Sequence, residues 1–189
     1  MGQAITLDRL NILVVDDNDH MRSLIRLILQ SFCCNQIREA SDGADALREM
    51  QAVVPDILVT NWNMAPLDGV ELTRHIRNSP DSPNPFMPII MVTAYAELYR
   101  VFAARDAGVT EFLVKPLSAK ALYSRVQAVI LRPRPFVRTK QFFGPDRRRH
   151  GEKPFIGKDR RGKDAPKPPP RPRDTVLEQD EINELFNPT

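Results

Sequence analysis

Short runs of aliphatic residues alternate with longer amphipathic stretches over the first 131 residues of the chain. Five of these runs are typical of strands, at residues 12–15, 37–39, 57–59, 89–92 and 112–114. Continuous Val/Ile/Leu runs suit parallel strands that are buried on both faces. Strands that alternate with helices five times predict an α/β fold, a five-stranded parallel doubly wound sheet.

Two of the stretches between the predicted strands show the apolar spacing of helices. Asn18 precedes one of them, which runs through Phe32, and Ser118 precedes the other, which runs through Ile130. Asn and Ser are preferred N-caps because their side chains accept hydrogen bonds from the first helical N–H groups. Both stretches therefore predict helices with defined starts.

The composition changes abruptly after residue 131. Residues 1–131 carry 12 Lys/Arg against 15 Asp/Glu, whereas residues 132–173 carry 15 against 4 and hold 9 of the 17 prolines. Residues 174–189 carry five acidic residues and no Lys or Arg. A segment as charged and proline-rich as 132–173 buries too little apolar surface to offset its ordering entropy. We therefore expect a globular domain over 1–131, a disordered basic arm over 132–173 and an acidic tail over 174–189.

The acidic tail has the signature of a short amphipathic helix. Thr175 and Glu178 have the spacing of a capping box, and Ile182, Leu185 and Phe186 form a small apolar face.

Polar residues follow the predicted strands where functional groups of doubly wound sheets gather, at the carboxyl ends. They are Asp16 and Asp17 after the first strand, Asn61 after the third, Thr93 after the fourth and Lys115 after the fifth. Paired carboxylates suit a hard cation such as Mg²⁺. A lysine and a hydroxyl facing them suit the oxygens of a phosphoryl group.

The motifs "ILVVDDN", "NWNM" with "LDG", "VTA" and "FLVKP" resemble the receiver domains of bacterial two-component response regulators, with CheY-like chemotaxis receivers the most similar in local wording. The resemblance covers about residues 9–131. It implies that Asp16, Asp17 and the backbone oxygen of Asn63 bind metal, and that Thr93 and Lys115 contact a phosphoryl group. It also implies that Phe112 is the switch aromatic residue and that the phosphoacceptor position is Asn61.

Asn61 departs from this family pattern, because the family has an aspartate there. A neutral carboxamide is a poor nucleophile for forming an acyl phosphate, and its presence removes one negative charge, so Mg²⁺ should bind only weakly. We expect no catalytic residue and no phosphorelay chemistry in this chain. Either the chain is a natural pseudo-receiver driven by another input, or it is an ordinary receiver substituted at this position.

The basic arm contains an internal repeat of the form F-x-G-x-D-R-R. The first unit runs from Phe142 to Arg148, and the second follows thirteen residues later, from Phe155 to Arg161. Arg offers a planar fork to guanine O6 and N7 and to phosphate, and Asp accepts hydrogen bonds from guanine N–H groups. A duplicated unit matches a ligand with two guanines and two phosphates, which is cyclic di-GMP.

The arm resembles the Arg-rich region of the Cle group of CheY-like cyclic di-GMP effectors. The predicted ligand contacts are Asp146, Arg147, Arg148, Arg149, Asp159, Arg160, Arg161 and Asp164, the last of which has Arg-x-x-Asp spacing from Arg161. The alternative is a nonspecific basic linker that is attracted to polyanions, which describes most Arg-rich runs.

The tail sequence "LEQDEINELFN" resembles the amino-terminal segment of the flagellar switch protein FliM, which chemotaxis receivers bind. On this chain the tail could dock on the receiver's own output face, made by the fourth and fifth helices and the fifth strand. It could equally recruit a second receiver.

These features together predict a cytoplasmic bacterial signalling protein and not an enzyme. We expect it to bind cyclic di-GMP and to act on the flagellar motor switch or related motility machinery, with recruitment to the motor or the cell pole. The alternative is an ordinary phospho-response regulator, altered at Asn61, with a polyanion-binding arm. No apolar run approaches the roughly 18 residues of a membrane span, and the 58 residues after 131 are too proline-rich for a DNA-binding domain.

Overall fold

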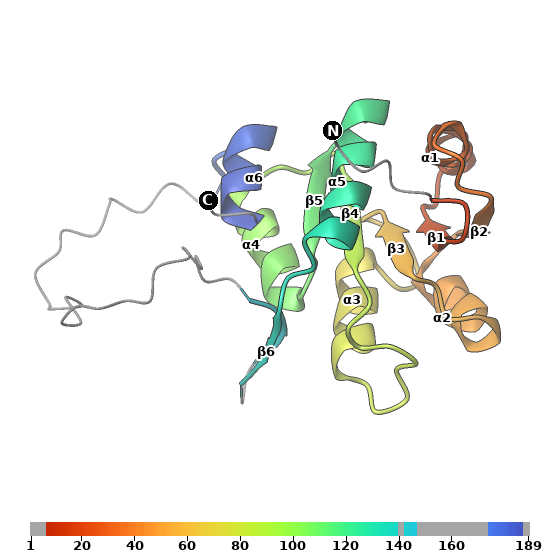
Figure 1. The fold of residues 1–189 in the computed structure, drawn as a ribbon. Coiled ribbons are helices and arrows are strands. Elements are labelled where there is room, and N and C mark those ends of the chain that lie inside the picture. Colours follow the sequence, from red (N-terminus) through yellow and green to blue (C-terminus); the bar gives the residue numbers. More distant parts are fainter. Residues whose placement is uncertain (1–6, 140–141, 147–173, 187–189) are drawn as a thin grey trace, which may run out of the picture.

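The computed structural model describes residues 7–139, 142–146 and 174–186. Its centre is a five-stranded sheet with all neighbouring strands parallel and the order β2-β1-β3-β4-β5 (Figure 1). The strands are β1 Asn11–Val15, β2 Gln36–Ala40, β3 Ile57–Thr60, β4 Ile89–Thr93 and β5 Glu111–Val114. The predicted doubly wound α/β sheet is confirmed, and each predicted strand lies within one or two residues of its observed position.

Helices cover both faces of this sheet. They are α1 Asp19–Ser31, α2 Gly43–Ala52, α3 Gly69–Asn78, α4 Leu98–Ala107, α5 Ala119–Leu131 and α6 Gln179–Phe186. Helices α1 and α5 pack on one face, and α2, α3, α4 and α6 pack on the other. None of the helices in the described part of the chain is long and apolar enough to cross a membrane.

Both predicted helix caps are present. The Asn18 side chain accepts a hydrogen bond from the Met21 N–H at 3.1 Å, and Ser118 Oγ accepts one from the Ala121 N–H at 3.1 Å. Each cap satisfies an N–H group that the helix cannot pair internally. The two caps fix where the chain turns from the carboxyl edge of the sheet into α1 and α5.

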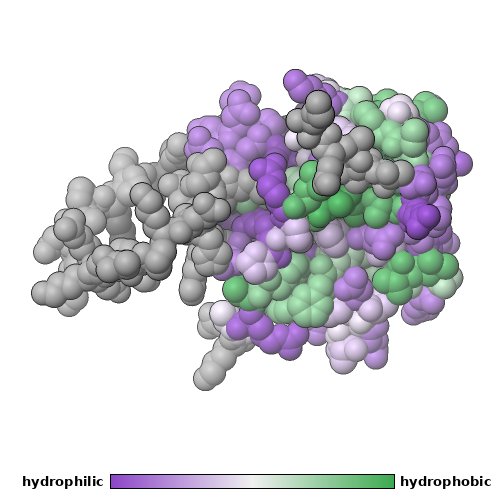
Figure 2. Space-filling model, in the orientation of Figure 1, coloured by the Kyte–Doolittle hydropathy of each residue, from purple (hydrophilic) through white to green (hydrophobic). Residues whose placement is uncertain are grey.

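A small antiparallel hairpin follows α5. Strands β6 Phe136–Arg138 and β7 Phe143–Pro145 pair with each other, and the hairpin packs beside α3 (Figure 1). Three rings form an aromatic cluster: Phe86 lies 5.3 Å from Phe136 and 5.2 Å from Phe143 between ring centroids. In Figure 2, a hydrophobic surface patch lies beside the hairpin.

The hairpin corrects one expectation from the sequence. We predicted that the disordered arm begins at residue 132, but residues 132–139 and 142–146 are ordered against the globular domain. The physical reason is the aromatic cluster, because the contacts among its three rings bury Phe143 and supply apolar packing that composition alone did not predict. The remainder of the predicted arm, residues 147–173, lies outside the described residues.

The acidic tail docks on the protein's own surface. Its segment before α6 forms an antiparallel bridge between Val176 and Glu97, with Leu98 N–H donating to Thr175 O at 2.8 Å and Leu177 N–H donating to Ala96 O at 2.9 Å. Glu97 gives α4 no side-chain cap, so the Thr175 carbonyl satisfies an N–H of its first turn.

Helix α6 then covers the free edge of the sheet at β5. Ile182 and Phe186 are fully buried, and the Phe186 ring lies 5.7 Å from the Phe112 ring. The Gln179 side chain accepts from the Val114 N–H at 2.7 Å and donates to Phe112 O at 3.0 Å. Because β5 is an edge strand, the side chain of Gln179 takes the place of a neighbouring strand. The hypothesis that the tail docks on its own receiver therefore agrees with the structure.

Candidate functional site

The polar residues predicted at the strand ends meet at the carboxyl edge of the sheet. All of them except Thr93 line a cavity of about 250 Å³ together with neighbouring loop residues. The lining residues are Asp16, Asp17, Asn18, Asn61, Asn63, Ala94, Tyr95 and Lys115. Parallel strands bring their carboxyl ends to one edge, so residues up to 99 positions apart in the chain lie side by side.

A buried ion pair forms the floor of this site. Lys115 Nζ lies 2.9 Å from Asp16 Oδ2, and the Asp16 side chain is 1% exposed. The other carboxylate oxygen, Oδ1, accepts a hydrogen bond from the Asn18 N–H at 3.0 Å. A buried carboxylate needs such partners, because an unpaired buried charge is strongly destabilising. Asp17, by contrast, is exposed at the mouth of the site.

Asn61 is held by three hydrogen bonds that fix the orientation of its amide. The Trp62 N–H donates to Asn61 Oδ1 at 2.9 Å, so the Nδ2 group faces the cavity. This Nδ2 donates to Asp17 Oδ1 at 3.1 Å and to Asn63 O at 3.2 Å. Gly69 packs directly behind, since a Cβ at that position would lie 2.0 Å from Asn61 O.

The hydrogen bonds of Asn61 bear on the Mg²⁺ that the receiver resemblance implies. Two of the three predicted metal ligands, the Asp17 carboxylate and the Asn63 carbonyl, accept from the amide Nδ2, while Asp16 is paired with Lys115. Within the described residues no group of three or more His, Cys, Asp or Glu side chains could hold a metal ion. A cation at Asp17 and Asn63 would have to share these oxygens with the amide N–H groups, so this donor set suits Mg²⁺ less well than one with a carboxylate at position 61.

The other two residues implied by the receiver resemblance are buried and do not line the cavity. Thr93 is fully buried, and its Oγ1 accepts a hydrogen bond from the Tyr95 N–H at 3.2 Å; it is not among the cavity-lining residues. Phe112 is 1% exposed and packs against Phe186 of α6. The predicted switch aromatic residue thus lies under the docked tail.

The sequence did not predict three of the lining residues as part of the site: Asn18, Ala94 and Tyr95. Asn18 contributes its N–H to the buried carboxylate, and Tyr95 borders the cavity with the Arg100 guanidinium carbon 4.1 Å from its ring centroid. Their positions in the chain could have indicated that they belong to the site. Asn18 directly follows the acidic pair, and Tyr95 lies two residues after Thr93.

Only one of the predicted cyclic di-GMP contacts falls within the described residues. Asp146 is 7% exposed, its N–H donates to Pro135 O at 2.8 Å, and its carbonyl accepts from Arg134. It would have to leave this packing to accept from a guanine. The other predicted contacts lie outside the described residues: Arg147, Arg148, Arg149, Asp159, Arg160, Arg161 and Asp164.

A parallel α/β sheet with an acidic pair, a facing lysine and a buried threonine at its carboxyl edge defines a receiver-type signalling domain. The family model of the response regulator receiver domain matches residues 12–127. The chain belongs to this family, and the match ends before the hairpin and α6.

Named relatives agree with this assignment. The chain is 33% identical to the chemotaxis protein CheY-3 of Vibrio cholerae over 130 residues, which is 69% of this chain and 98% of that protein. It is 35% identical to the chemotaxis protein CheY of Pseudomonas aeruginosa over 123 residues, or 65% of this chain and 98% of that protein. A crystal structure of a response regulator from Chloroflexus aurantiacus is similar with a TM-score of 0.60 at 28% identity, covering 65% of this chain and 98% of that one.

Proposed function

We propose that this chain is a receiver protein of bacterial chemotaxis signalling whose input is cyclic di-GMP and not a phosphoryl group. Its Arg-rich arm binds the dinucleotide, and its receiver domain acts on the flagellar motor switch or related motility machinery. The protein works in the cytoplasm and is recruited to the motor or the cell pole. Mg²⁺ binds weakly and carries no step of this function.

The observation that carries the proposal is the hydrogen-bonded amide of Asn61. The amide has no ionised oxygen to attack a phosphoryl donor, and its Nδ2 donates to Asp17 and Asn63, the groups that a metal would need. A receiver with its phosphoryl site closed in this way needs another input if it is to signal.

The repeat in the arm supports cyclic di-GMP as that input. A nonspecific polyanion tether needs only charge, which Lys supplies as well as Arg, and gains nothing from a carboxylate in each unit. Each unit instead combines one Asp with two Arg, the side chains that pair with guanine edges and phosphate. High affinity would require most of these contacts together, because ordering a segment on binding costs about 2–5 kcal/mol.

The names of the relatives support chemotaxis as the output. The relatives from Vibrio cholerae and Pseudomonas aeruginosa are both chemotaxis proteins. The tail that resembles a FliM segment lies on the face made by α4 and β5, so it would compete there with a motor peptide of similar sequence.

Isothermal titration calorimetry with the full chain tests the proposal. Cyclic di-GMP, GMP and a short RNA are compared at two salt concentrations. The proposal requires saturable binding of cyclic di-GMP that exceeds binding of GMP and survives the higher salt. If the RNA binds as tightly as cyclic di-GMP and its binding falls steeply with salt, the arm is a polyanion-binding tether of an ordinary response regulator.

A further inference from the structure

A second cavity, of about 440 Å³, lies at the opposite edge of the sheet from the receiver site. It is enclosed by the end of α3, the loop that leads into β4, and the β6–β7 hairpin. Because α3 ends and β4 begins there, this is the amino edge of the sheet. Six of its lining residues define its chemistry: Arg77, Pro80, Pro85, Arg138, Phe142 and Phe143.

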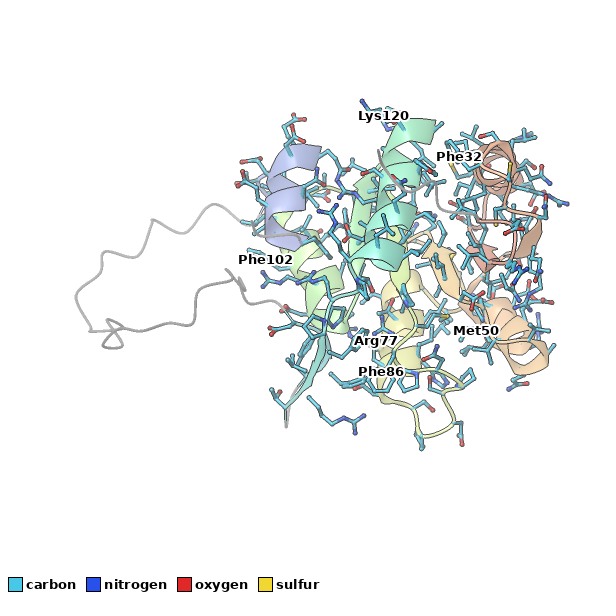
Figure 3. The ribbon with its side chains drawn as sticks, viewed as in Figure 1. Phe32, Met50, Arg77, Phe86, Phe102 and Lys120 are labelled. Carbon is cyan, nitrogen blue, oxygen red and sulfur yellow. The ribbon has the colours of Figure 1, made fainter. Side chains whose placement is uncertain are left out.

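Arg77 is a buried cation with no counterion among the described residues. The residue is 1% exposed, and its guanidinium donates from Nε to Gly108 O at 3.1 Å and from Nη1 to Pro85 O at 2.7 Å. Its Nη2 is buried and has no hydrogen-bond partner in the described part of the chain. The guanidinium carbon lies 5.0 Å from the centroid of the Phe136 ring. Figure 3 shows Arg77 near the end of α3, close to Phe86 of the loop before β4.

The charge of Arg77 persists at neutral pH although burial opposes it. Burial lowers the pKa of the guanidinium well below its ordinary value, to about 9, and no carboxylate within the described residues raises it. A buried charge of this kind is normally paired, because desolvation is costly and an opposite charge offsets the cost. An anion in the cavity that Arg77 lines would supply the missing opposite charge.

A second guanidinium borders the same space. Arg138 is exposed, and its guanidinium carbon lies 4.5 Å from the Phe143 ring centroid, which holds the side chain against the hairpin. Phe142 and two prolines provide apolar walls. Gly144 permits this arrangement, because a Cβ there would lie 2.8 Å from the Phe142 ring and 3.0 Å from Gly108 Cα.

We propose that this cavity binds a small ligand that carries an oxyanion, a phosphate or a carboxylate, on a flat apolar group. The oxyanion pairs with Arg77 and Arg138, since guanidinium groups bind both anions with two parallel hydrogen bonds. The flat group packs on Phe142 and the prolines. A volume of this size lies at the lower end of the range of roughly 300–1,000 Å³ for small-molecule sites. The site does not depend on the second repeat unit or on cyclic di-GMP.

Titration of the full chain with simple probes tests this site. The probes are phenyl phosphate, benzoate and the neutral benzyl alcohol, and the readout is NMR of the backbone amides and of the Arg77 Nε–H group. At least one anionic probe should bind saturably and shift Arg77 Nε–H, Gly108 and Phe143, whereas benzyl alcohol should not. The comparison of phenyl phosphate with benzoate identifies which oxyanion the cavity prefers.

Two charge-matched variants separate this site from general attraction to a basic surface. Arg138→Gln should weaken binding of the preferred anion about tenfold. Arg132→Gln removes one exposed charge nearby, outside the cavity lining, and should leave the affinity within about twofold of the original. The proposal is overturned if neither anion binds saturably to the folded protein, if Arg77 Nε–H does not respond, or if both variants weaken binding equally. The last two outcomes would leave Arg77 as a structural arginine that holds the hairpin.

Discussion

Replacing Phe186 with alanine should release the tail from the receiver domain without unfolding the domain. The Phe186 ring is 1% exposed and packs 5.7 Å from the Phe112 ring at an interplanar angle of 30°. When the tail is released, the ring keeps its contacts within α6 and loses its buried contacts with the receiver domain. Phe186 extends the core on one face of the sheet, so the substitution acts on the docking equilibrium and removes only the part of that core that the tail supplies.

The size of the effect follows from the burial of the ring. Truncating a fully buried Phe to Ala costs about 3–5 kcal/mol, and every 1.4 kcal/mol is a factor of ten. Docking should thus weaken by roughly two to three and a half orders of magnitude. Gln179→Ala removes two side-chain hydrogen bonds to β5 and should weaken docking less, by about 1–3 kcal/mol.

Native-state hydrogen exchange measures this equilibrium at two amides. Leu98 N–H donates to Thr175 O and Val114 N–H donates to Gln179 Oε1, so both are protected only while the tail is docked. Phe186→Ala should accelerate both exchange rates strongly, and Glu184→Ala, at an exposed position of α6, should change neither. If Phe186→Ala leaves the protection of both amides unchanged, the tail does not hold this face in solution.

Release of the tail should also open the face that it covers. Deleting residues 175–189 is expected to increase binding of a flagellar switch peptide, because the peptide no longer competes with an attached segment. An attached competitor acts at an effective concentration that is set by its tether, so removing it should raise the affinity of the peptide. Fluorescence anisotropy with a labelled peptide measures the change. Equal affinity of the full and truncated chains would rule out competition at this face.

Four further variants test three other parts of the molecule. Asn61→Asp adds a carboxylate to the site, so it should tighten Mg²⁺ binding and permit labelling by acetyl phosphate. The original chain should gain no phosphoryl mass under the same conditions, and a labelled Asn61 would refute this. Asp159→Ala should weaken cyclic di-GMP binding by about 1–3 kcal/mol although it makes the arm more positive, and Arg→Lys at Arg160 and Arg161 should weaken it too, both by calorimetry. Normal binding by both variants would reduce the arm to a basic tether. Cys33, which follows α1, has a positive φ of 63°, so Cys33→Gly should relieve about 1–2 kcal/mol of backbone strain. The greater entropy of glycine in the unfolded chain cancels part of this gain. The Tm should still rise by a few degrees, and a lower Tm would contradict this.

The sheet and its site were predictable because both depend on local patterns. Aliphatic runs fix buried parallel strands, and the topology of such a sheet then brings their carboxyl ends together whatever the sequence separation. Asp16 and Lys115 could therefore be placed in one site from two short motifs. The orientation of the Asn61 amide could not be predicted from the sequence, because it depends on one hydrogen bond from the backbone N–H of Trp62.

The hairpin was missed because its stability is not local. Phe136 and Phe143 lie in a stretch whose charge and proline content indicate disorder, and their partner Phe86 comes from a loop about 50 residues earlier. Composition averages over a segment, whereas three rings at the right positions suffice to order thirteen residues. The same limit hid Arg77, which looks like an ordinary surface arginine of an amphipathic helix until the hairpin covers it.

The receiver site and the docked tail share one stretch of backbone, and this stretch provides a physical route for coupling between them. Thr93 ends β4, and within the next five residues Ala96, Glu97 and Leu98 form the main-chain contacts to the tail. Any event at the site that moves the backbone after Thr93 must also move the groups that hold the tail. Linkage makes such a coupling reciprocal, so occupancy of the face by the tail biases the site by the same free energy.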